Sequence, residues 1–316
     1  MNIEKIFDYA RENNISDIHL LEGEKIYFRK DGKIIEYDGT DTVSKEELLE
    51  ICNGKIEEDF AYTDSKNQRY RVNSFLTRGK LALVIRIINK EPIKLKGKFI
   101  NKVIDEKILS LKDGLVLVTG ITGSGKSTTL ANIIGKFNEN KNLKILTIED
   151  PIEYIFENKK SLIIQRELGK DVESFEKALK SSLRQDPDVI ILGEIRDEES
   201  LYSALKLAET GHLVFSTLHT MNTVESVNRL ISMVRSEKKD FIREQLASVL
   251  RFILSQELHR GKKTVPIFEI LNNTKAVANL ILNNKLNQIP TLIESGIENF
   301  MITKEKYLKN LETESD

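Results

Sequence analysis

Cysteine, tryptophan, long apolar runs and an excess of either charge are scarce or missing in this sequence. The one cysteine, Cys52, excludes a disulfide framework and a cysteine-based zinc site. No apolar run approaches the ~20 residues that a helix needs to span a bilayer, so we expect no direct membrane insertion. Lys and Arg number 48 against 49 Asp and Glu, and this balance argues against a nucleic-acid partner.

The first eight residues are acidic and lack the apolar core of a signal peptide. We therefore expect a cytoplasmic protein that would reach membrane machinery only through a partner. The length of 316 residues predicts about two domains, and 40% hydrophobic with 31% charged residues is typical of a globular protein.

Short strands and hairpin turns dominate residues 1–90, which we predict to be a small α+β domain with a mostly antiparallel sheet. Residues 2–13 have the apolar spacing of a helix. Ser44 and Glu47 form a capping box at the start of a helix predicted over 44–53. The clearest predicted hairpin joins Arg69–Leu76 to Leu81–Ile88 through a turn at Arg78 and Gly79.

A change of pattern separates this domain from the rest of the chain. Residues 91–104 contain several lysines, a proline and a glycine, and we predict an exposed linker there. Residues 105–316 then alternate strands with helices, which indicates an α/β domain with a parallel sheet. The expected strands are Leu115–Thr119, Lys144–Ile148, Val189–Leu192, Leu213–Leu218 and Val265–Leu271. The expected helices lie near 126–138, 172–184, 198–209, 223–233, 239–257, 274–283, 287–296 and 303–311.

A complete phosphate-binding loop motif lies between the first of these strands and the first helix. Gly120 is followed by four residues and then by Gly125, Lys126 and Ser127. Glycines let backbone N–H groups converge on an anion, and the helix N-terminus adds its positive end. In such loops the lysine reaches the β- and γ-phosphates of ATP and the hydroxyl ligates Mg²⁺. The predicted nucleotide-binding residues are Gly120, Thr122, Gly123, Ser124, Gly125, Lys126, Ser127 and Thr128.

Acidic residues follow two of the other expected strands, where a ligand of an open α/β sheet would lie. Glu194 comes directly after Gly193 at the end of the apolar run Val189–Leu192, the position of a carboxylate that serves Mg²⁺ and its water. A second acidic group follows the strand over 144–148 and consists of Glu149, Asp150 and Glu153. For each acid, a helix cap or a turn is the alternative role.

Two histidines flank the strand expected over 213–218. A strand of six residues is about 20 Å long, so His212 and His219 cannot reach the same phosphate within one subunit. His219 is at the ligand end, where we expect it to contribute to catalysis. His212 is at the far end, where an interface role or a structural cap is expected.

Several motifs in one order resemble those of the type II/type IV secretion ATPase superfamily. Residues 183–197 resemble its signature, 147–154 its Asp box and 209–220 its His box, and the phosphate-binding loop is its Walker A motif. Residues 15–20 and 70–75 also match, so the resemblance covers nearly the whole chain.

Within the superfamily the chain is most similar to the retraction ATPases of type IV pili. It has one small domain before the ATPase core and lacks the tetracysteine insert common in assembly and type II secretion ATPases. Residues 276–283 resemble a motif associated with retraction. Here Ala278, Leu282 and Asn283 replace two arginines and a glutamate, so the charged face of that helix is lost while its apolar face persists.

The resemblance implies a PAS-like N-terminal domain, a RecA-like P-loop NTPase core and a homo-hexamer. It implies that Glu194 acts on Mg²⁺ through water, that Glu153 is the likelier of the acids to be the general base, and that His212 belongs to the nucleotide-binding set. Arginines of the N-terminal domain would also contact phosphates, and the candidates are Arg71, Arg78 and Arg86. The neighbours of Arg86 are apolar, so its guanidinium needs an anionic partner, either a phosphate or an acid of the same chain. The predicted catalytic residues are Lys126, Glu153, Glu194 and His219.

These features predict a hexameric ATP-hydrolysing motor for type IV pilus retraction and twitching motility. The implied partner is an inner-membrane pilus platform protein, reached from the cytoplasmic face. A pilus assembly or type II secretion ATPase is one alternative. A nucleotide-gated scaffold that does not hydrolyse ATP is another, and the balanced charge disfavours a nucleic-acid translocase.

Overall fold

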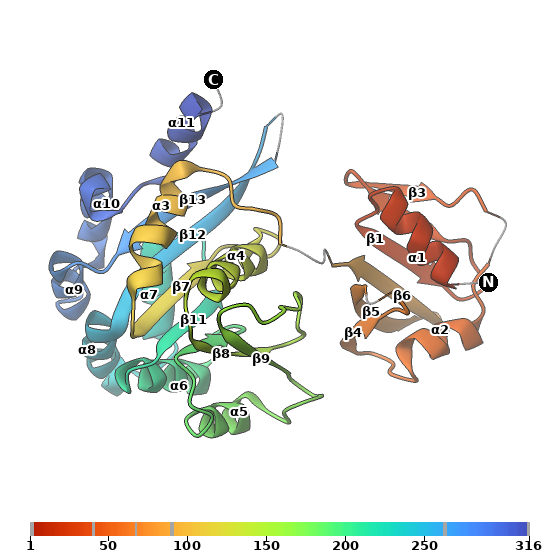
Figure 1. Cartoon of the computed structure of the whole chain (residues 1–316), viewed down its shortest axis with the longest axis horizontal. Helices are drawn as coiled ribbons and strands as arrows, with labels where there is room; N and C mark the ends of the chain where they lie inside the picture. The colour runs from red at the N-terminus through yellow and green to blue at the C-terminus, as the bar shows by residue number, and fades with distance from the viewer. Residues whose placement is uncertain (1–2, 40–41, 67, 89–91, 262–263, 315–316) are drawn as a thin grey trace. The chain divides into compact units, whose positions relative to one another are not determined.

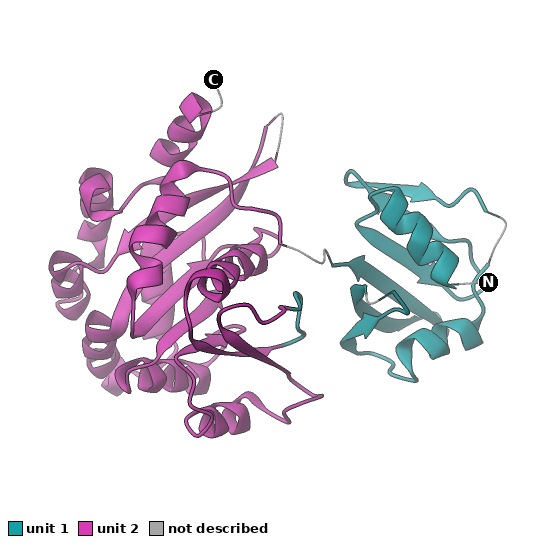
Figure 2. Ribbon diagram, viewed as in Figure 1, with its two compact units in different colours: residues 1–91, 150–155 teal, residues 92–149, 156–316 magenta. Residues whose placement is uncertain are grey.

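The computed structural model describes residues 3–39, 42–66, 68–88, 92–261 and 264–314. The chain forms two compact units (Figure 2). One consists of Met1–Glu91 with Asp150–Ile155, and the other of Pro92–Glu149 with Phe156–Asp316. Each unit is held together by its own buried apolar side chains.

The first unit is an antiparallel sheet with helices α1 (Ile3–Glu12) and α2 (Lys45–Cys52) (Figure 1). In the order β3-β2-β1-β6-β5-β4, the sheet contains β1 (Asp17–Leu21), β2 (Tyr27–Lys30), β3 (Lys33–Glu36), β4 (Asp59–Thr63), β5 (Arg69–Thr77) and β6 (Lys80–Ile87). Phe7 of α1 and Leu48 of α2 are buried with Ile18 of β1 in one core. The predicted small α+β domain with an antiparallel sheet is thereby confirmed.

Two local signals in this unit form as the sequence predicts. The Ser44 hydroxyl accepts the Glu47 N–H, and the Glu47 carboxylate accepts the Ser44 N–H, which closes the capping box of α2. Arg78 and Gly79 have φ values of 52° and 77°, and both are therefore left-handed. This is the conformation that a two-residue hairpin turn between β5 and β6 requires.

The second unit is built on a sheet in the order β13-β12-β7-β11-β10-β8-β9. Neighbouring strands are parallel except β12 and β13, which are antiparallel. The strands are β7 (Gly114–Thr119), β8 (Lys144–Glu149), β9 (Leu162–Glu167), β10 (Val189–Leu192), β11 (Leu213–Leu218), β12 (Leu250–Arg260) and β13 (Thr264–Asn272). Leu115 and Leu117 of β7 face one core, and Val116 and Val118 face the other. Because both faces of the sheet are covered, its central strands are unbroken apolar runs in the sequence.

Helices cover both faces of this sheet (Figure 1). On one face lie α5 (Phe175–Ser182), α6 (Glu198–Glu209), α7 (Thr223–Ser232), α8 (Lys239–Val249), α9 (Lys275–Leu282) and α10 (Ile289–Ser295). On the other lie α3 (Lys98–Glu106), α4 (Lys126–Asn140) and α11 (Lys304–Glu314). Short 3-10 turns occur at Ile108–Ser110, Ser236–Lys238, Leu286–Gln288 and Ile297–Asn299. Within the described ranges, no helix is long and apolar enough to cross a membrane.

The long helix predicted over 239–257 is wrong in its second half. Helix α8 ends at Val249, and the chain continues directly into β12. Phe252, Ile253 and Leu254 are all buried, because β12 lies between β7 and β13 and has helices on both sides. A strand buried on both faces has no alternating pattern, so periodicity alone does not separate it from a buried helix.

Four other elements differ from the prediction. Strands β4 and β9 are edge strands that the sequence analysis did not name. The helix expected over 172–184 is shorter, with Ser174 as the N-cap of α5. Residues 98–104 of the predicted exposed linker belong to helix α3, whose Ile100, Val103 and Ile104 are buried in the core of the second unit.

Candidate nucleotide-binding site

The sheet order of the second unit brings three of the predicted segments to one edge. Strands β7, β11 and β10 are neighbours, with Thr119 paired to Leu218. The phosphate-binding loop follows β7, His219 follows β11, and Glu194 follows β10 after Gly193. Parallel strands end on the same side, so these segments share the carboxyl edge of the sheet, where ligands of such folds bind.

The loop from Gly120 to Gly125 has the backbone of an anion-binding nest. Gly120, Gly123 and Gly125 have φ values of 151°, 77° and 87°, which are conformations that favour glycine. A Cβ added to Gly120 would lie 2.3 Å from the Gln256 carbonyl oxygen, so the backbone there has no room for a side chain. Gly125 is the N-cap of α4 and offers no capping side chain, which leaves the first N–H groups of the helix available to an anion.

Lys126 begins α4 and extends back over the loop. Its ammonium donates hydrogen bonds to the carbonyl oxygens of Gly120, at 2.7 Å, and Ile121, at 3.1 Å. The residue is only 9% exposed. A cation held this deep in a cradle of N–H groups fits a polyphosphate. The hydroxyl groups of Ser127 and Thr128 follow at the half-buried start of the helix and suit a Mg²⁺ ion that accompanies the phosphates.

Glu194 and His219 are in direct contact beside this loop. His219 Nε2 lies 3.1 Å from Glu194 Oε2, and His219 Nδ1 lies 3.4 Å from the Thr122 hydroxyl. Arg196 donates from Nε to the other carboxylate oxygen of Glu194. Thr122 is in the loop itself, so this chain of contacts joins the ends of β10 and β11 to the phosphate-binding loop.

The charge state of His219 follows from its surroundings. Burial lowers the pKa of His219, and the positive charges of Lys126 and Arg196 lower it further. The imidazole is therefore neutral at pH 7, and its contact with Glu194 is a hydrogen bond rather than an ion pair. A carboxylate only accepts, so the proton is on Nε2, and Nδ1 is left to accept from the Thr122 hydroxyl.

His212 lies at the opposite end of β11. Its Nδ1 is 3.1 Å from the Thr210 hydroxyl and 3.2 Å from the Leu207 carbonyl oxygen, at the end of α6. The structure therefore does not bring His212 into the group around the loop. Its contacts are those of a residue that closes the turn between α6 and β11.

The acids at the end of β8 and directly after it are divided between the two units. Glu149 ends β8, where its carboxylate accepts from the Thr147 hydroxyl at 2.6 Å and from Gln165 Nε2 at 3.3 Å. Asp150–Ile155 belongs to the first unit. There Glu153 Oε1 lies 3.7 Å from Arg71 Nη1.

The three candidate arginines also belong to the first unit. Arg71 holds Asp59 through Nε at 2.9 Å, and this hydrogen bond raises the pKa of the guanidinium. Arg86 donates from Nε to Asp17 at 2.8 Å, so an acid of the same chain is the anionic partner that its apolar neighbours required. The Arg86 side chain is nevertheless 65% exposed. Arg78 is exposed at the tip of the β5–β6 hairpin.

Gln256 contacts the loop, although the sequence analysis did not name it. It lies in β12, and its side-chain amide forms hydrogen bonds with both Ser124 and Thr129. The residue was missed because a helix was predicted over 239–257. The available signal was a polar amide two residues after the apolar run Phe252–Leu254, which is unexpected in a buried segment.

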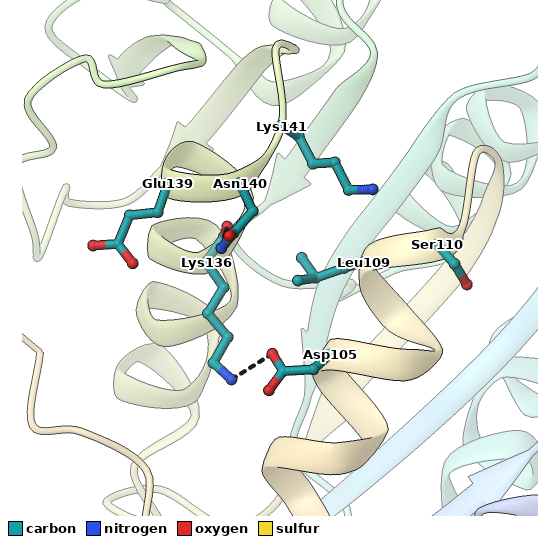
Figure 3. A pocket seen from close by; sticks show the side chains of 7 residues that line it. All are labelled: Asp105, Leu109, Ser110, Lys136, Glu139, Asn140 and Lys141. Atoms are coloured by element: carbon teal, nitrogen blue, oxygen red, sulfur yellow. Dashed lines mark hydrogen bonds and ion pairs between the residues drawn. The ribbon is translucent and has the colours of Figure 1, made fainter.

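A cavity of about 540 Å³ lies at the other end of α4 (Figure 3). It is lined by Asp105, Leu109, Ser110, Lys136, Glu139, Asn140 and Lys141. Across it, Lys136 Nζ bonds Asp105 Oδ1 at 2.6 Å. Helix α4 starts at the phosphate-binding loop, and its 15 residues put this cavity roughly 20 Å away from the loop. The cavity is therefore separate from the nucleotide site.

A parallel sheet with a glycine loop and a buried lysine at its carboxyl edge defines a P-loop NTPase with a RecA-like core. A profile of the type II/IV secretion system protein family matches residues 1–265. The chain belongs to this family.

Individual relatives are similar over nearly their full length. The uncharacterized protein YggR of Escherichia coli is 41% identical over 96% of this chain and 96% of its own. The type IV pilus retraction ATPase PilT of Pseudomonas aeruginosa is 36% identical over 98% of this chain and 94% of its own. A crystal structure of the pilus retraction motor PilT with bound ADP has a TM-score of 0.85 and 36% identity, and covers 99% of this chain and 94% of that one.

These findings confirm the predicted family, the predicted fold class and the prediction that the chain is an ATPase. The prediction of a pilus retraction function agrees with the same relatives. The relatives also support the prediction that the chain uses a nucleotide. The roles of individual site residues stay predictions.

Proposed function

We propose that this chain is an ATP-hydrolysing motor that powers type IV pilus retraction and, through it, twitching motility. One observation carries the proposal. The lysine of a complete phosphate-binding loop lies beside a contacting Glu194–His219 pair, in a chain that is similar over its full length to a pilus retraction motor. The geometry supports hydrolysis, and the relatives support the mechanical output.

The phosphate-binding loop supplies binding and charge neutralisation. Its N–H groups and the start of α4 hold the phosphate oxygens, and Lys126 exchanges the carbonyl oxygens of Gly120 and Ile121 for the β- and γ-phosphates. Mg²⁺, when bound with ATP, offsets charge that develops on the phosphates. Ser127 would ligate this ion directly, and Glu194 would hold it through water.

The Glu194–His219 pair supplies orientation at the γ-phosphate side. The neutral imidazole donates to Oε2 of Glu194, which fixes the plane of the carboxylate. Arg196 holds the other oxygen. Of the acids after β8, Glu153 is the proposed general base that takes a proton from the attacking water, on the pattern of the family.

The arginines of the first unit are the proposed partners of the phosphates when the chain assembles as a homo-hexamer. Arg71, Arg78 and Arg86 would act within one chain or between neighbours. Exposure of Arg86 allows its guanidinium to exchange Asp17 for a phosphate. An arginine supplied in this way can raise the rate of phosphoryl transfer ~10³–10⁵-fold.

The chain would close on the triphosphate and reopen after hydrolysis, and this would move the two units as rigid bodies. We propose that the ring delivers this motion to an inner-membrane pilus platform protein at the cytoplasmic face of the membrane. Pilin subunits would then be withdrawn from the fibre.

The direct test is ATP turnover by the purified chain with Mg²⁺. Lys126→Ala and Glu194→Gln are expected to lower kcat to background, because each removes a charge that acts on the phosphates or the ion. Lys177→Ala is the matched control, since it removes only an exposed i,i+4 pair with Glu173, which contributes little. Wild-type turnover in both site variants would reject the assignment of the site. Absence of turnover in the unaltered protein would favour the non-hydrolysing scaffold.

A pilus assembly or type II secretion ATPase is the second candidate, and helix α9 is the observation that favours it. Leu282 of α9 is 46% exposed, so an apolar side chain faces solvent where the retraction motif carries an arginine. Deleting the gene distinguishes the two functions. Loss of a retraction motor leaves surface pili intact or more abundant, whereas loss of an assembly motor leaves none.

A further inference from the structure

Gln256 of β12 connects this strand to both parts of the phosphate-binding motif. Its Nε2 donates to the Ser124 carbonyl oxygen at 2.5 Å, and its Oε1 accepts from the Thr129 hydroxyl at 2.5 Å. Strand β12 runs beside β7 (Figure 1), with Ser255 paired to Thr119, so Gln256 lies level with the start of the loop. One amide therefore ties the loop to the first turn of α4.

The bond to Ser124 determines where a neighbouring N–H group points. The Ser124 carbonyl and the Gly125 N–H belong to the same planar trans peptide, so they point in opposite directions. When Gln256 holds the carbonyl toward β12, the Gly125 N–H is directed away from β12. Gly125 has a left-handed φ of 87° and is the N-cap of α4. The first N–H groups of this helix have no capping side chain.

The backbone of the phosphate-binding loop packs closely against Gln256. A Cβ on Gly120 would lie 2.3 Å from the Gln256 carbonyl oxygen, and one on Gly125 would lie 2.9 Å from Gln256 Nε2. Gln256, Ser124 and Thr129 are 3%, 2% and 0% exposed. Water does not reach this depth. Loss of the Gln256 amide would therefore leave the Ser124 carbonyl and the Thr129 hydroxyl unsatisfied.

We propose that Gln256 is a positioning residue for nucleotide binding, which holds the phosphate-binding loop in the conformation that receives phosphates. It acts through Ser124 and Thr129 and is itself too buried to touch the nucleotide. The inference rests on the nucleotide-binding role proposed above for this loop, and it adds a strand that the motif does not include.

The test compares substitutions of almost unchanged volume in the full chain. Gln256→Met removes both hydrogen bonds and keeps the length of the side chain, and Thr129→Val removes only one partner. Thr129→Ser is the conservative rescue, and Ser216→Ala is the control, because it replaces a buried polar residue of β11 that is away from the loop. Mg·ADP affinity is measured by calorimetry, ATP turnover as kcat and KM, and folding by thermal unfolding without nucleotide.

Gln256→Met is expected to weaken Mg·ADP binding by about tenfold, the scale of one or two lost hydrogen bonds, and to raise KM for ATP with it. Thr129→Val is expected to shift the affinity in the same direction by less, while Thr129→Ser and Ser216→Ala keep the wild-type affinity. A folded Gln256→Met protein with wild-type affinity and a lower unfolding temperature would overturn the proposal and show a structural role alone.

If Gln256→Met does not fold, Thr129→Val decides, and a wild-type affinity in that variant overturns the proposal. Failure of the unaltered chain to hydrolyse ATP would count against the proposed motor only. The comparison of Mg·ADP affinities would still decide the role of Gln256.

Discussion

Gly120 illustrates how residue identity is determined by atoms far away in the sequence. Its φ of 151° is open to few other residues, and the main chain of β12 at Gln256 occupies the place of a Cβ. The sequence motif already required glycine here for the turn. The second reason, contact with a strand 136 positions later in the chain, came only from the tertiary structure.

Gly120→Ala is expected to weaken nucleotide binding by at least about tenfold and to destabilise the fold by about 1–3 kcal/mol, because the new methyl group meets a backbone oxygen. Gly135→Ala in α4 is the matched control. A Cβ there meets nothing within 4 Å, so alanine should stabilise the helix by about 0.5–1 kcal/mol. Urea unfolding and Mg·ADP titration measure both. Equal stability of the two variants would contradict the packing argument.

At the scale of elements, features set by adjacent residues were predicted better than those set by burial between distant segments. The capping box of α2 and the hairpin turn at Arg78 and Gly79 were predicted correctly, since each depends on residues adjacent in the chain. Strands β10 and β11 have the predicted bounds because a fully buried parallel strand is one short apolar run between polar ends. Strand β12 was predicted as helix because it follows α8 without a turn and is buried on both faces.

The cap of α2 gives a prediction for the first unit. Ser44→Ala removes the hydroxyl that accepts the Glu47 N–H and should lower the stability of this unit by about 1 kcal/mol. Ser44→Thr keeps an acceptor and should lose less than half of that. Urea unfolding followed by circular dichroism measures both. An alanine variant as stable as the threonine variant would mean that the box contributes nothing.

The whole molecule consists of two compact units, and the proposed motor depends on movement between them. Cys52 is buried, so cysteines introduced at exposed sites can carry a pair of fluorophores without competition from it. Lys33→Cys on β3 and Lys180→Cys on α5 label different units, and Lys180→Cys with Lys309→Cys labels the second unit alone.

Energy transfer between the labels at 33 and 180 is expected to differ between Mg·ADP and Mg·ATP, the latter measured in the Glu194→Gln background to prevent turnover. The pair at 180 and 309 should report the same efficiency in both states, because both positions lie in one unit. An identical efficiency for the first pair in every nucleotide state would exclude a motor that works by moving these units.

The sequence by itself determined the family, the α/β fold class and the ATPase, because a phosphate-binding loop needs its residues contiguous and a buried parallel strand needs an unbroken apolar run. It also placed Glu194 and His219 at the ends of strands. Only the tertiary structure decided that these two side chains touch. It alone brought Gln256 against the loop, since the order in which strands pair across a sheet is set by packing between distant segments and is not written in any local pattern.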